Sequence, residues 1–389
     1  MSISIKEIFL ANGNWESYQD KYRFMTRPVE REEVEKMLKC RDYTQGHTTY
    51  ECPKCGYITT IPFTCKSRLC TVCGKKHTDA WADKVSKELL EVTHRHMVFT
   101  MPDKLWPCME RHRHLLKDVM DTVKTTLEAV VNHRWKALQV VPGIITVLHT
   151  YGKDLKFNPH IHAIVTEGGL REREKERDPY NRERWVDVSF FPYEKLRKVW
   201  QYQLLTTVGE RLPYDKELHR LLDQLYREKE NGFYVYAKRR IQGKQKEFIC
   251  RYVARYVRHP AIAETRIDSY DPETRMVEFW YRHDDDTETV SMHVYEFIGK
   301  LVSHIPPRQF KTIRYYGLYA RNKKRRIQDV LTRLKRFARK LRQLGLQRYT
   351  RTCPWQPSLE PVCPECGTRM KFVSLYLPDQ GYITPEDGT

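Results

Sequence analysis

The segment Asn158-Pro159-His160-Ile161-His162-Ala163-Ile164-Val165 decides how we interpret the rest of this chain. Its apolar, partly β-branched residues predict a β-strand, in which residues two apart point to the same face. His160 and His162 therefore aim their imidazoles at one spot, while Ile161 and Ala163 face the opposite, packed side. Two neutral imidazoles aimed at one spot indicate a divalent-metal site. Taken alone, a His-x-His strand is equally compatible with two packed histidines.

The composition favours a polyanionic partner. The chain has 389 residues and a formal net charge of +19, from 69 Lys and Arg against 50 Asp and Glu. Nucleic acid is the usual partner of such a protein, and the 24 tyrosines suit base stacking on single strands. Hydrophobic residues make up 40% of the chain, enough for a sizeable core and two or three modules. We find neither a membrane-spanning apolar run nor a signal peptide, so we expect a cytoplasmic protein without membrane contact.

The cysteines predict zinc sites rather than disulfides, because Cys-x-x-Cys pairs in a cytosolic chain are typical of zinc. Cys52-Pro-Lys-Cys55 and Cys70-Thr-Val-Cys73 each form a knuckle, and we predict that the two knuckles share one tetrahedral, structural zinc. Four more residues could join that site or build a second one: Cys40, His47, Cys65 and His77. Cys363-Pro-Glu-Cys366, with Cys353, predicts another zinc site in the tail, whose fourth ligand is not evident.

Helical and strand patterns alternate along the chain. We expect strands at 94–101, 143–151, 158–165 and 232–237, and the second and third of these form an antiparallel hairpin. We expect helices at 78–91, 193–208, 214–229, 247–258 and 294–303. A long helical region is also expected between the first strand and about residue 138. Between 260 and 294 the pattern is β-rich, and a last strand is expected at 310–316. Residues 321–347 predict a basic amphipathic helix, whose charged face is either simply solvated or, as we favour, in contact with the DNA backbone.

Tyr252 and Tyr256 give the histidines a chemical meaning. Their spacing of four puts both phenols on one face of the expected helix. A tyrosine can attack a phosphodiester and become covalently joined to one side of the break. A divalent ion held by His160 and His162 would assist by polarising the scissile phosphate. An arbitrary pair of tyrosines at this spacing is more often simply packed, so the interpretation depends on the histidines and on the basic charge.

Together these motifs resemble the HUH-type transposases of bacterial insertion sequences, in particular insertion-sequence family ninety-one. The resemblance covers roughly residues 35–370 and is carried by SRLCTVCGKKH, VLHTYGKDLKFNPHIHAIVTEGG, FICRYVARYVRHPAIAETRI, HIPPRQFKTIRYYGLYARNKK and CPECG. It implies an α+β fold, in which an antiparallel-sheet endonuclease core has helices on one side, a zinc module before it and a helical, zinc-tipped tail after it. The domains implied are 1–92 (helical lead-in and zinc binding), 93–320 (nuclease core) and 321–389 (basic helix and Cys-x-x-Cys element).

The resemblance also implies a function: nicking and rejoining of single-stranded DNA at element ends through 5′-phosphotyrosine links. In that mechanism Tyr252 and Tyr256 attack, and His160 and His162 hold Mg²⁺ or Mn²⁺. His149, where many relatives have glutamine, is our candidate for a third metal ligand. Its rivals are His94 and His96. Residues placed to contact DNA are Arg255, Arg258, Lys238, Arg239, Arg240, Lys323, Lys324, Arg325 and Arg326.

The implied partners are single-stranded and hairpin DNA at the element ends and target DNA, in the bacterial cytoplasm at the nucleoid. The chain has no GxxxxGK[ST] loop, so unwinding would require a host helicase. Two other functions stay open at this point. A plasmid replication initiator or relaxase uses the same core, although the cysteine cluster and tail argue against it. A non-catalytic, zinc-containing DNA-binding regulator would keep its activity after Tyr252→Phe and Tyr256→Phe.

Overall fold

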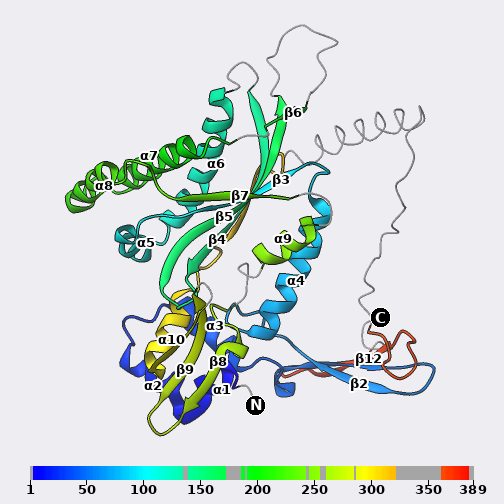
Figure 1. The fold of residues 1–389 in the computed structure, drawn as a ribbon. Helices are drawn as coiled ribbons and strands as arrows, with labels where there is room; N and C mark the ends of the chain where they lie inside the picture. Colours follow the sequence, from blue (N-terminus) through cyan, green and yellow to red (C-terminus); the bar gives the residue numbers. More distant parts are fainter. Residues whose placement is uncertain are drawn as a thin grey trace, which may run out of the picture.

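The computed structural model describes residues 3–134, 139–171, 185–188, 191–241, 245–254, 260–283, 286–320 and 361–384. The centre of this part is a six-stranded sheet in the order β11-β4-β5-β3-β7, with β6 paired to β5 (Figure 1). Its strands are β3 (His94–Phe99), β4 (Val140–Tyr151), β5 (Phe157–Arg171), β6 (Trp185–Asp187), β7 (Val235–Ile241) and β11 (Ile313–Gly317). All neighbouring strands are antiparallel, which confirms the predicted α+β fold and the β4–β5 hairpin.

Alternation along the strands gives the sheet two different faces. On one face, residues such as Phe99, Ile161 and Val165 pack against a helical layer in the largest hydrophobic core. This layer contains α5 (Trp106–Arg111), α6 (Leu115–Arg134), α7 (Tyr193–Arg211) and α8 (Lys216–Glu228). On the other face, Val147 and Ile164 pack against α4 (Thr71–Glu88) and α9 (Gln245–Ala254), which lie over part of the sheet (Figure 1). His160 and His162 belong to this second face.

A separate hydrophobic core packs the N-terminal helices against the β-rich region that follows residue 260. Helices α1 (Ile5–Leu10), α2 (Asn14–Lys21) and α3 (Pro28–Leu38) pack against the sheet β10-β9-β8 and α10. The elements from the later region are β8 (Ile267–Asp271), β9 (Met276–His283), β10 (Asp286–His293) and α10 (Val294–Ser303). The helix predicted at 294–303 and the β-rich pattern before it are therefore confirmed.

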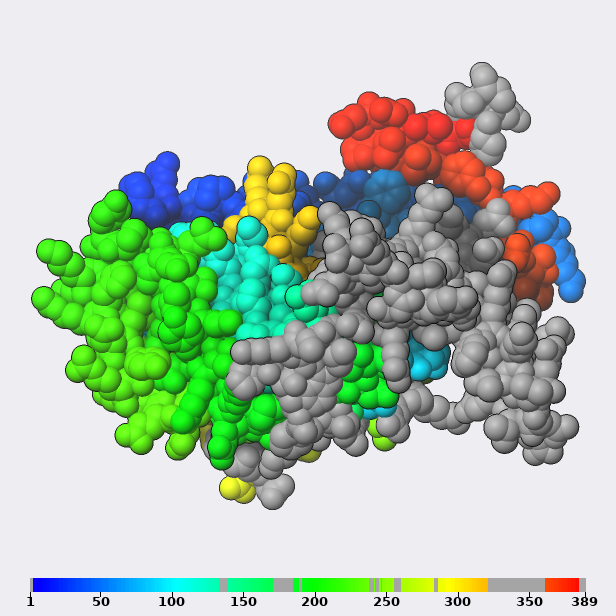
Figure 2. Space-filling model, turned by 90° about the horizontal axis from the view of Figure 1, so that it is seen from above, coloured from blue at the N-terminus to red at the C-terminus, as the bar shows by residue number. Residues whose placement is uncertain are grey.

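The fourth group of elements is a small sheet with the strand order β13-β12-β1-β2. It combines β1 (His47–Glu51) and β2 (Ile58–Pro62) with β12 (Lys371–Leu377) and β13 (Gly381–Ile383). Figure 1 shows this sheet at one side of the molecule, and in Figure 2 the C-terminal residues in red lie against the N-terminal ones in blue. Short 3₁₀ helices occur at Ala11–Gly13, Tyr43–Gln45, Asp103–Leu105 and Glu264–Arg266.

One predicted helix begins earlier than expected, and two predicted segments fall largely outside the described residues. Helix α4 begins at Thr71 rather than at 78, because the Cys70 sulfur caps its first turn by accepting a hydrogen bond from the Cys73 amide. The basic helix expected at 321–347 and most of the charged insertion at 170–184 lie outside the described residues. None of the helices in the described ranges is long and apolar enough to cross a membrane.

Candidate metal and tyrosine site

Three histidines meet on the face of the central sheet that α4 and α9 partly cover. The β4–β5 register places His149 directly opposite His160, and His162 lies next on the same face of β5. His149 Nδ1 is 3.1 Å from His160 Nε2, and the ring centroids of His149 and His162 are 4.0 Å apart. Their ring nitrogens are close enough to hold one metal ion together.

The chemistry of these nitrogens fits a divalent ion. His160 Nδ1 lies 2.7 Å from the Asn158 carbonyl oxygen, so it donates its proton there and Nε2 keeps a lone pair facing His149. Two nitrogens bound at right angles to an ion at about 2.1 Å would be about 3.0 Å apart, close to the observed distance. Burial lowers the pKa of His149, His160 and His162, which keeps them in the neutral form that binds metal.

The two rival histidines on β3 have different surroundings. His96 Nε2 lies 2.8 Å from His162 Nδ1, with the rings stacked at 5.0 Å. This contact places His96 against His162 and outside the group of three histidines, where it would orient the His162 ring if an ion were bound. His94 instead contacts the Val92 carbonyl (2.9 Å) and the Tyr319 hydroxyl (2.6 Å), away from the cluster.

Tyr252 on α9 lies beside the histidines. Its ring centroid is 6.1 Å from that of His162 and 5.6 Å from that of His96. The aromatic ring is half-buried and its neighbours on the helix, Ile249 and Val253, pack on the sheet. Tyr256, Arg255 and Arg258 lie outside the described residues.

A groove of about 1230 Å³ runs past the histidines and Tyr252. One wall is the first half of α4, and the segment Pro260–Arg266 forms another part. Tyr234 and Tyr236 also line it, because Val235 and Ala237 alternate with them and face the opposite core. Sequence reasoning missed these two tyrosines, although the alternation in Gly232-Phe-Tyr-Val-Tyr-Ala237 is the signal that would have found them.

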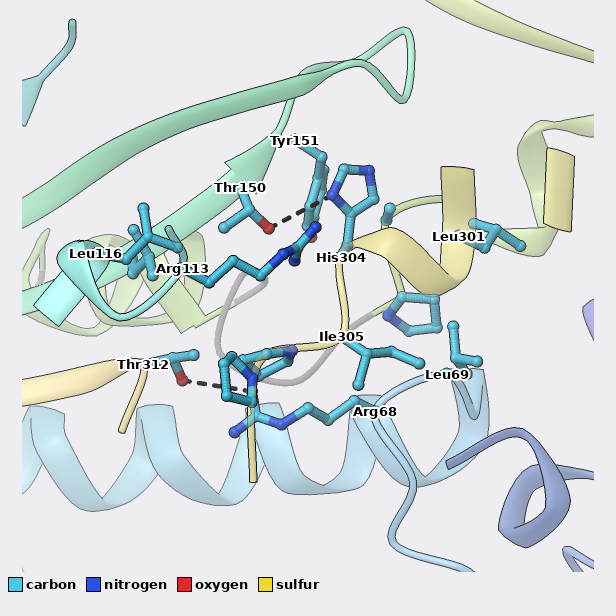
Figure 3. A pocket seen from close by; sticks show the side chains of 15 residues that line it. Arg68, Leu69, Arg113, Leu116, Thr150, Tyr151, Leu301, His304, Ile305 and Thr312 are labelled. Atoms are coloured by element: carbon cyan, nitrogen blue, oxygen red, sulfur yellow. Dashed lines mark hydrogen bonds between the residues drawn. The ribbon is translucent and has the colours of Figure 1, made fainter. Parts of the chain in front are cut away.

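A smaller pocket of about 50 Å³ lies behind the end of β4, beyond Tyr151 (Figure 3). In it Thr150 Oγ1 is 3.5 Å from His304 Nδ1, and Arg68 Nη1 donates to Thr312 Oγ1 at 3.5 Å. Burial lowers the pKa of His304 to about 4. The first contact ties the strand that carries His149 to the residue after α10, and the second ties Arg68 to the segment before β11, so we regard the pocket as support for the site.

The cysteines form two clusters that differ from the predicted grouping. Cys70 and Cys73 meet Cys40 and Cys65, with Sγ–Sγ distances of 3.6 Å from Cys40 to both Cys70 and Cys73, and from Cys65 to Cys73. The prediction that the two N-terminal knuckles share one zinc is therefore wrong. The reason is that α4 carries the second knuckle toward the end of α3, whereas the first knuckle closes the β1–β2 hairpin. Hydrogen bonds from the Cys65 thiol and the Cys73 amide lower the pKa of Cys70 to about 5.

The first knuckle pairs with the tail. Its Cys52 and Cys55 meet Cys363 and Cys366, so the N-terminal pair, not a further residue of the tail, completes a group of four thiols. Cys353 lies outside the described residues. The two histidines considered as alternatives belong to neither cluster in the described chain. His47 Nδ1 contacts the Tyr43 carbonyl at 3.1 Å, and His77 is exposed on α4.

The basic residues predicted to contact DNA are only partly placed. Lys238, Arg239 and Arg240 belong to β7, the edge strand that pairs with β3. The side chains of these three residues are not described. Lys323, Lys324, Arg325 and Arg326 lie outside the described residues.

Comparisons with known proteins agree with this organisation. Residues 10–101 match the family described as "Transposase zinc-binding domain", and residues 143–326 match the one described as "Putative transposase". The chain is 30% identical to "Transposase for insertion sequence element IS801" from Pseudomonas savastanoi pv. phaseolicola over 331 residues, 81% of this chain and 76% of the relative. It is 26% identical to "Putative transposase y4qJ" from Sinorhizobium fredii (strain NBRC 101917 / NGR234) over 297 residues, 72% and 71% of the two chains. No solved structure matches the chain.

The zinc-binding module and the domain that follows it define a transposase, an enzyme that processes DNA. The combination of a matched zinc-binding domain with two clusters of four thiols supports structural zinc. By its similarity to the IS801 transposase over most of both chains, this chain belongs to the IS91 family of insertion-sequence transposases.

Proposed function

We propose that this transposase cuts and rejoins single-stranded DNA through its own tyrosines. The observation that carries the proposal is the position of Tyr252, whose ring centroid lies 6.1 Å from that of His162, beside three histidines whose pKa values are lowered by burial. Mg²⁺ or Mn²⁺ bound by His149, His160 and His162 would polarise a nonbridging oxygen of the scissile phosphate.

The phenol oxygen attacks phosphorus, and the bond from phosphorus to the 3′ oxygen breaks. The 3′ oxygen leaves as a hydroxyl after taking up a proton, while the phenol proton is lost. The product is a 5′-phosphotyrosine, and attack by a 3′ hydroxyl reverses the step and rejoins a strand. Tyr256 is the second tyrosine in this proposal and takes part in strand transfer. Rejoining needs no ATP, because the phosphotyrosine conserves the phosphodiester.

The groove suits a single strand better than a duplex. Two aromatic side chains, Tyr234 and Tyr236, line it on the face that carries the histidines, and Lys75 lines the opposite wall. Tyrosine rings stack on unpaired bases, which a duplex does not offer, and the ammonium group attracts phosphate. The partners we propose are therefore single-stranded and hairpin DNA at element ends and target DNA, with unwinding by a host helicase at the bacterial nucleoid.

The test is a covalent adduct. The purified full-length protein is incubated with Mn²⁺ and labelled single-stranded oligonucleotides that span the ends of its element, and the products are separated on denaturing gels. We expect labelled protein from the wild type, less from Tyr252→Phe, and none from the double variant Tyr252→Phe/Tyr256→Phe.

Tyr214→Phe is the matched control, since Tyr214 is 95% exposed and stands between α7 and α8, away from the groove. It should form the adduct at the wild-type level. An undiminished adduct in the double variant would refute the proposed nucleophiles. Tight DNA binding with no adduct under any metal would favour a non-catalytic regulator instead.

A further inference from the structure

We propose that Cys52, Cys55, Cys363 and Cys366 hold a zinc ion that joins the two ends of the chain, and we call this the split zinc site. The Sγ atoms of Cys52 and Cys366 are 3.5 Å apart, and those of Cys55 and Cys363 are 3.6 Å apart. All four sulfurs lie within 4.8 Å of one another. Zinc binds sulfur at about 2.3 Å, so the sulfurs of a tetrahedral site are about 3.8 Å apart. The four thiols are thus already arranged as a zinc site requires.

The two halves are copies of one short motif. Each reads Cys-Pro-x-Cys-Gly, at 52–56 and at 363–367. Gly56 and Gly367 both have φ of 70°, a left-handed conformation that favours glycine. Each glycine amide donates to the carbonyl of the first cysteine, at 2.9 Å in the first knuckle and 3.0 Å in the second. The knuckle at 70–74 lacks the proline and begins a helix instead.

The backbone amide of the first cysteine makes an equivalent hydrogen bond in both knuckles. Cys52 N–H donates to the Tyr57 carbonyl and Cys363 N–H to the Thr368 carbonyl, both at 2.8 Å. These bonds turn the chain tightly around each pair of thiols and aim both sulfurs to one side. Two such turns facing each other provide four converging sulfurs, which is the arrangement of closed structural zinc sites.

The strand before the first knuckle and the strand after the second one hold the two halves together. β12 pairs with β1 from His47↔Tyr376 to Glu51↔Lys371, so the tail completes the N-terminal sheet. The first cysteine of each knuckle is only 1% exposed, and Met370 covers both. This core is small, and a hairpin with so few buried apolar residues needs further stabilisation, which a structural metal supplies.

The site anchors the tail on the far side of a basic stretch. Residues 321–360 contain 13 Lys and Arg against two acidic residues. The described chain before this stretch ends at Ala320, just after β11 of the central sheet, and the chain after it enters the split zinc site. If this stretch contacts DNA backbone, which rests on the function proposed above, then fixing its flanks raises its effective concentration at the bound DNA.

Zinc content tests the site. We would measure zinc per chain by mass spectrometry in full-length wild type, Cys52→Ser/Cys55→Ser, Cys363→Ser/Cys366→Ser and the quadruple variant. A split site predicts that each double variant loses one of the two zinc ions and that the quadruple variant loses no more than either. Separate sites at the two ends would make the losses add. Cys108→Ser, a half-buried cysteine outside both clusters, should keep both ions.

Several results would overturn the proposal. These are full zinc content in Cys363→Ser/Cys366→Ser, additive losses in the quadruple variant, or disulfides in place of zinc in the non-reduced wild type. Hydrogen exchange provides a second measurement that does not depend on metal content. Amides of β1 should lose protection in Cys363→Ser/Cys366→Ser, while those of β3 stay protected. Unchanged protection of β1 would also contradict the proposal.

DNA binding tests the consequence separately. We expect Cys363→Ser/Cys366→Ser to weaken binding of a single-stranded oligonucleotide several-fold and to flatten its salt dependence, because phosphate contacts are lost. Its adduct yield at saturating DNA should stay at the wild-type level. Unchanged affinity together with a lost zinc would leave the split site standing and refute its DNA role. No adduct in the wild type would refute the proposed chemistry without affecting the zinc count.

Discussion

We expect His96→Ala to weaken metal binding although His96 lies outside the group of three histidines. His96 is buried and its Nε2 lies 2.8 Å from His162 Nδ1, so donation of the Nδ1 proton to His96 would fix the tautomer in which His162 Nε2 can bind the ion. Without this acceptor the His162 ring loses its fixed tautomer and orientation. Replacing such an outer partner of a metal-binding histidine typically costs about 10- to 100-fold in metal affinity, or about 1.4–2.7 kcal/mol.

The assay is a titration of the full-length protein with Mn²⁺, with the free ion followed by electron paramagnetic resonance. His96→Gln is the rescue variant, because its amide oxygen can accept from His162 Nδ1. His94→Ala is the control: His94 lies two residues away on β3 and is equally buried, but it contacts Tyr319 instead. We expect His94→Ala to cost stability and to leave the Mn²⁺ affinity nearly unchanged.

A second measurement compares the Mn²⁺ concentration needed for half-maximal rate with the rate at saturating Mn²⁺. In adduct formation, His96→Ala should need more Mn²⁺ for half-maximal rate, and saturating Mn²⁺ should restore most of the rate. Equal losses of Mn²⁺ affinity in His96→Ala and His94→Ala would show a general destabilisation. Unchanged affinity in His96→Ala would refute the reasoning outright.

Three further predictions concern other side chains. His149→Ala should weaken metal-dependent adduct formation while His149→Gln retains most of it, and unchanged Mn²⁺ dependence in His149→Ala would remove it from the ligand set. Tyr234 is 53% exposed, and the Arg197 guanidinium lies 4.9 Å from its ring. We expect this ring to contribute about 1–3 kcal/mol to single-strand binding. In a fluorescence titration Tyr234→Ala should lose this binding energy and Tyr234→Phe should keep it. His304, with its pKa lowered to about 4, stays neutral in the folded state while the unfolded chain takes up a proton below about pH 6.5. Stability present above pH 6.5 should therefore fall by up to about 3 kcal/mol toward pH 4 in urea unfolding, and His304→Gln should flatten that slope.

Local patterns were sufficient for much of the site. Period-two alternation and a short turn specified the β4–β5 hairpin, and a hairpin register follows from its turn. His149 could be chosen as a candidate metal ligand because it lies on the partner strand of that hairpin. The contact between His96 and His162 could not be predicted from local patterns, because the pairing of β3 with β5 joins residues 66 positions apart in the chain.

The zinc grouping failed for the same physical cause. Spacing identifies a knuckle, but any two knuckles can share an ion if the fold brings them together. The nearest knuckle in sequence was therefore the wrong choice for Cys52 and Cys55. The repeated Cys-Pro-x-Cys-Gly was a sequence signal for the pairing of Cys52 and Cys55 with Cys363 and Cys366, because both copies form the same turn.

The start of helix α4 carries two cysteines of a four-thiol cluster and also lines the groove beside the histidines. Cys70 caps the helix and Cys73 lies in its first turn, while Thr71 and Lys75, between and just beyond them, line the groove. An ion held by Cys70 and Cys73 with Cys40 and Cys65 would therefore fix the position of a groove wall as well as the fold around it. In the proposed function, the zinc module would thus be part of the surface that faces the DNA strand, and its loss should disturb strand binding even where the proposed ion of the histidines is still bound.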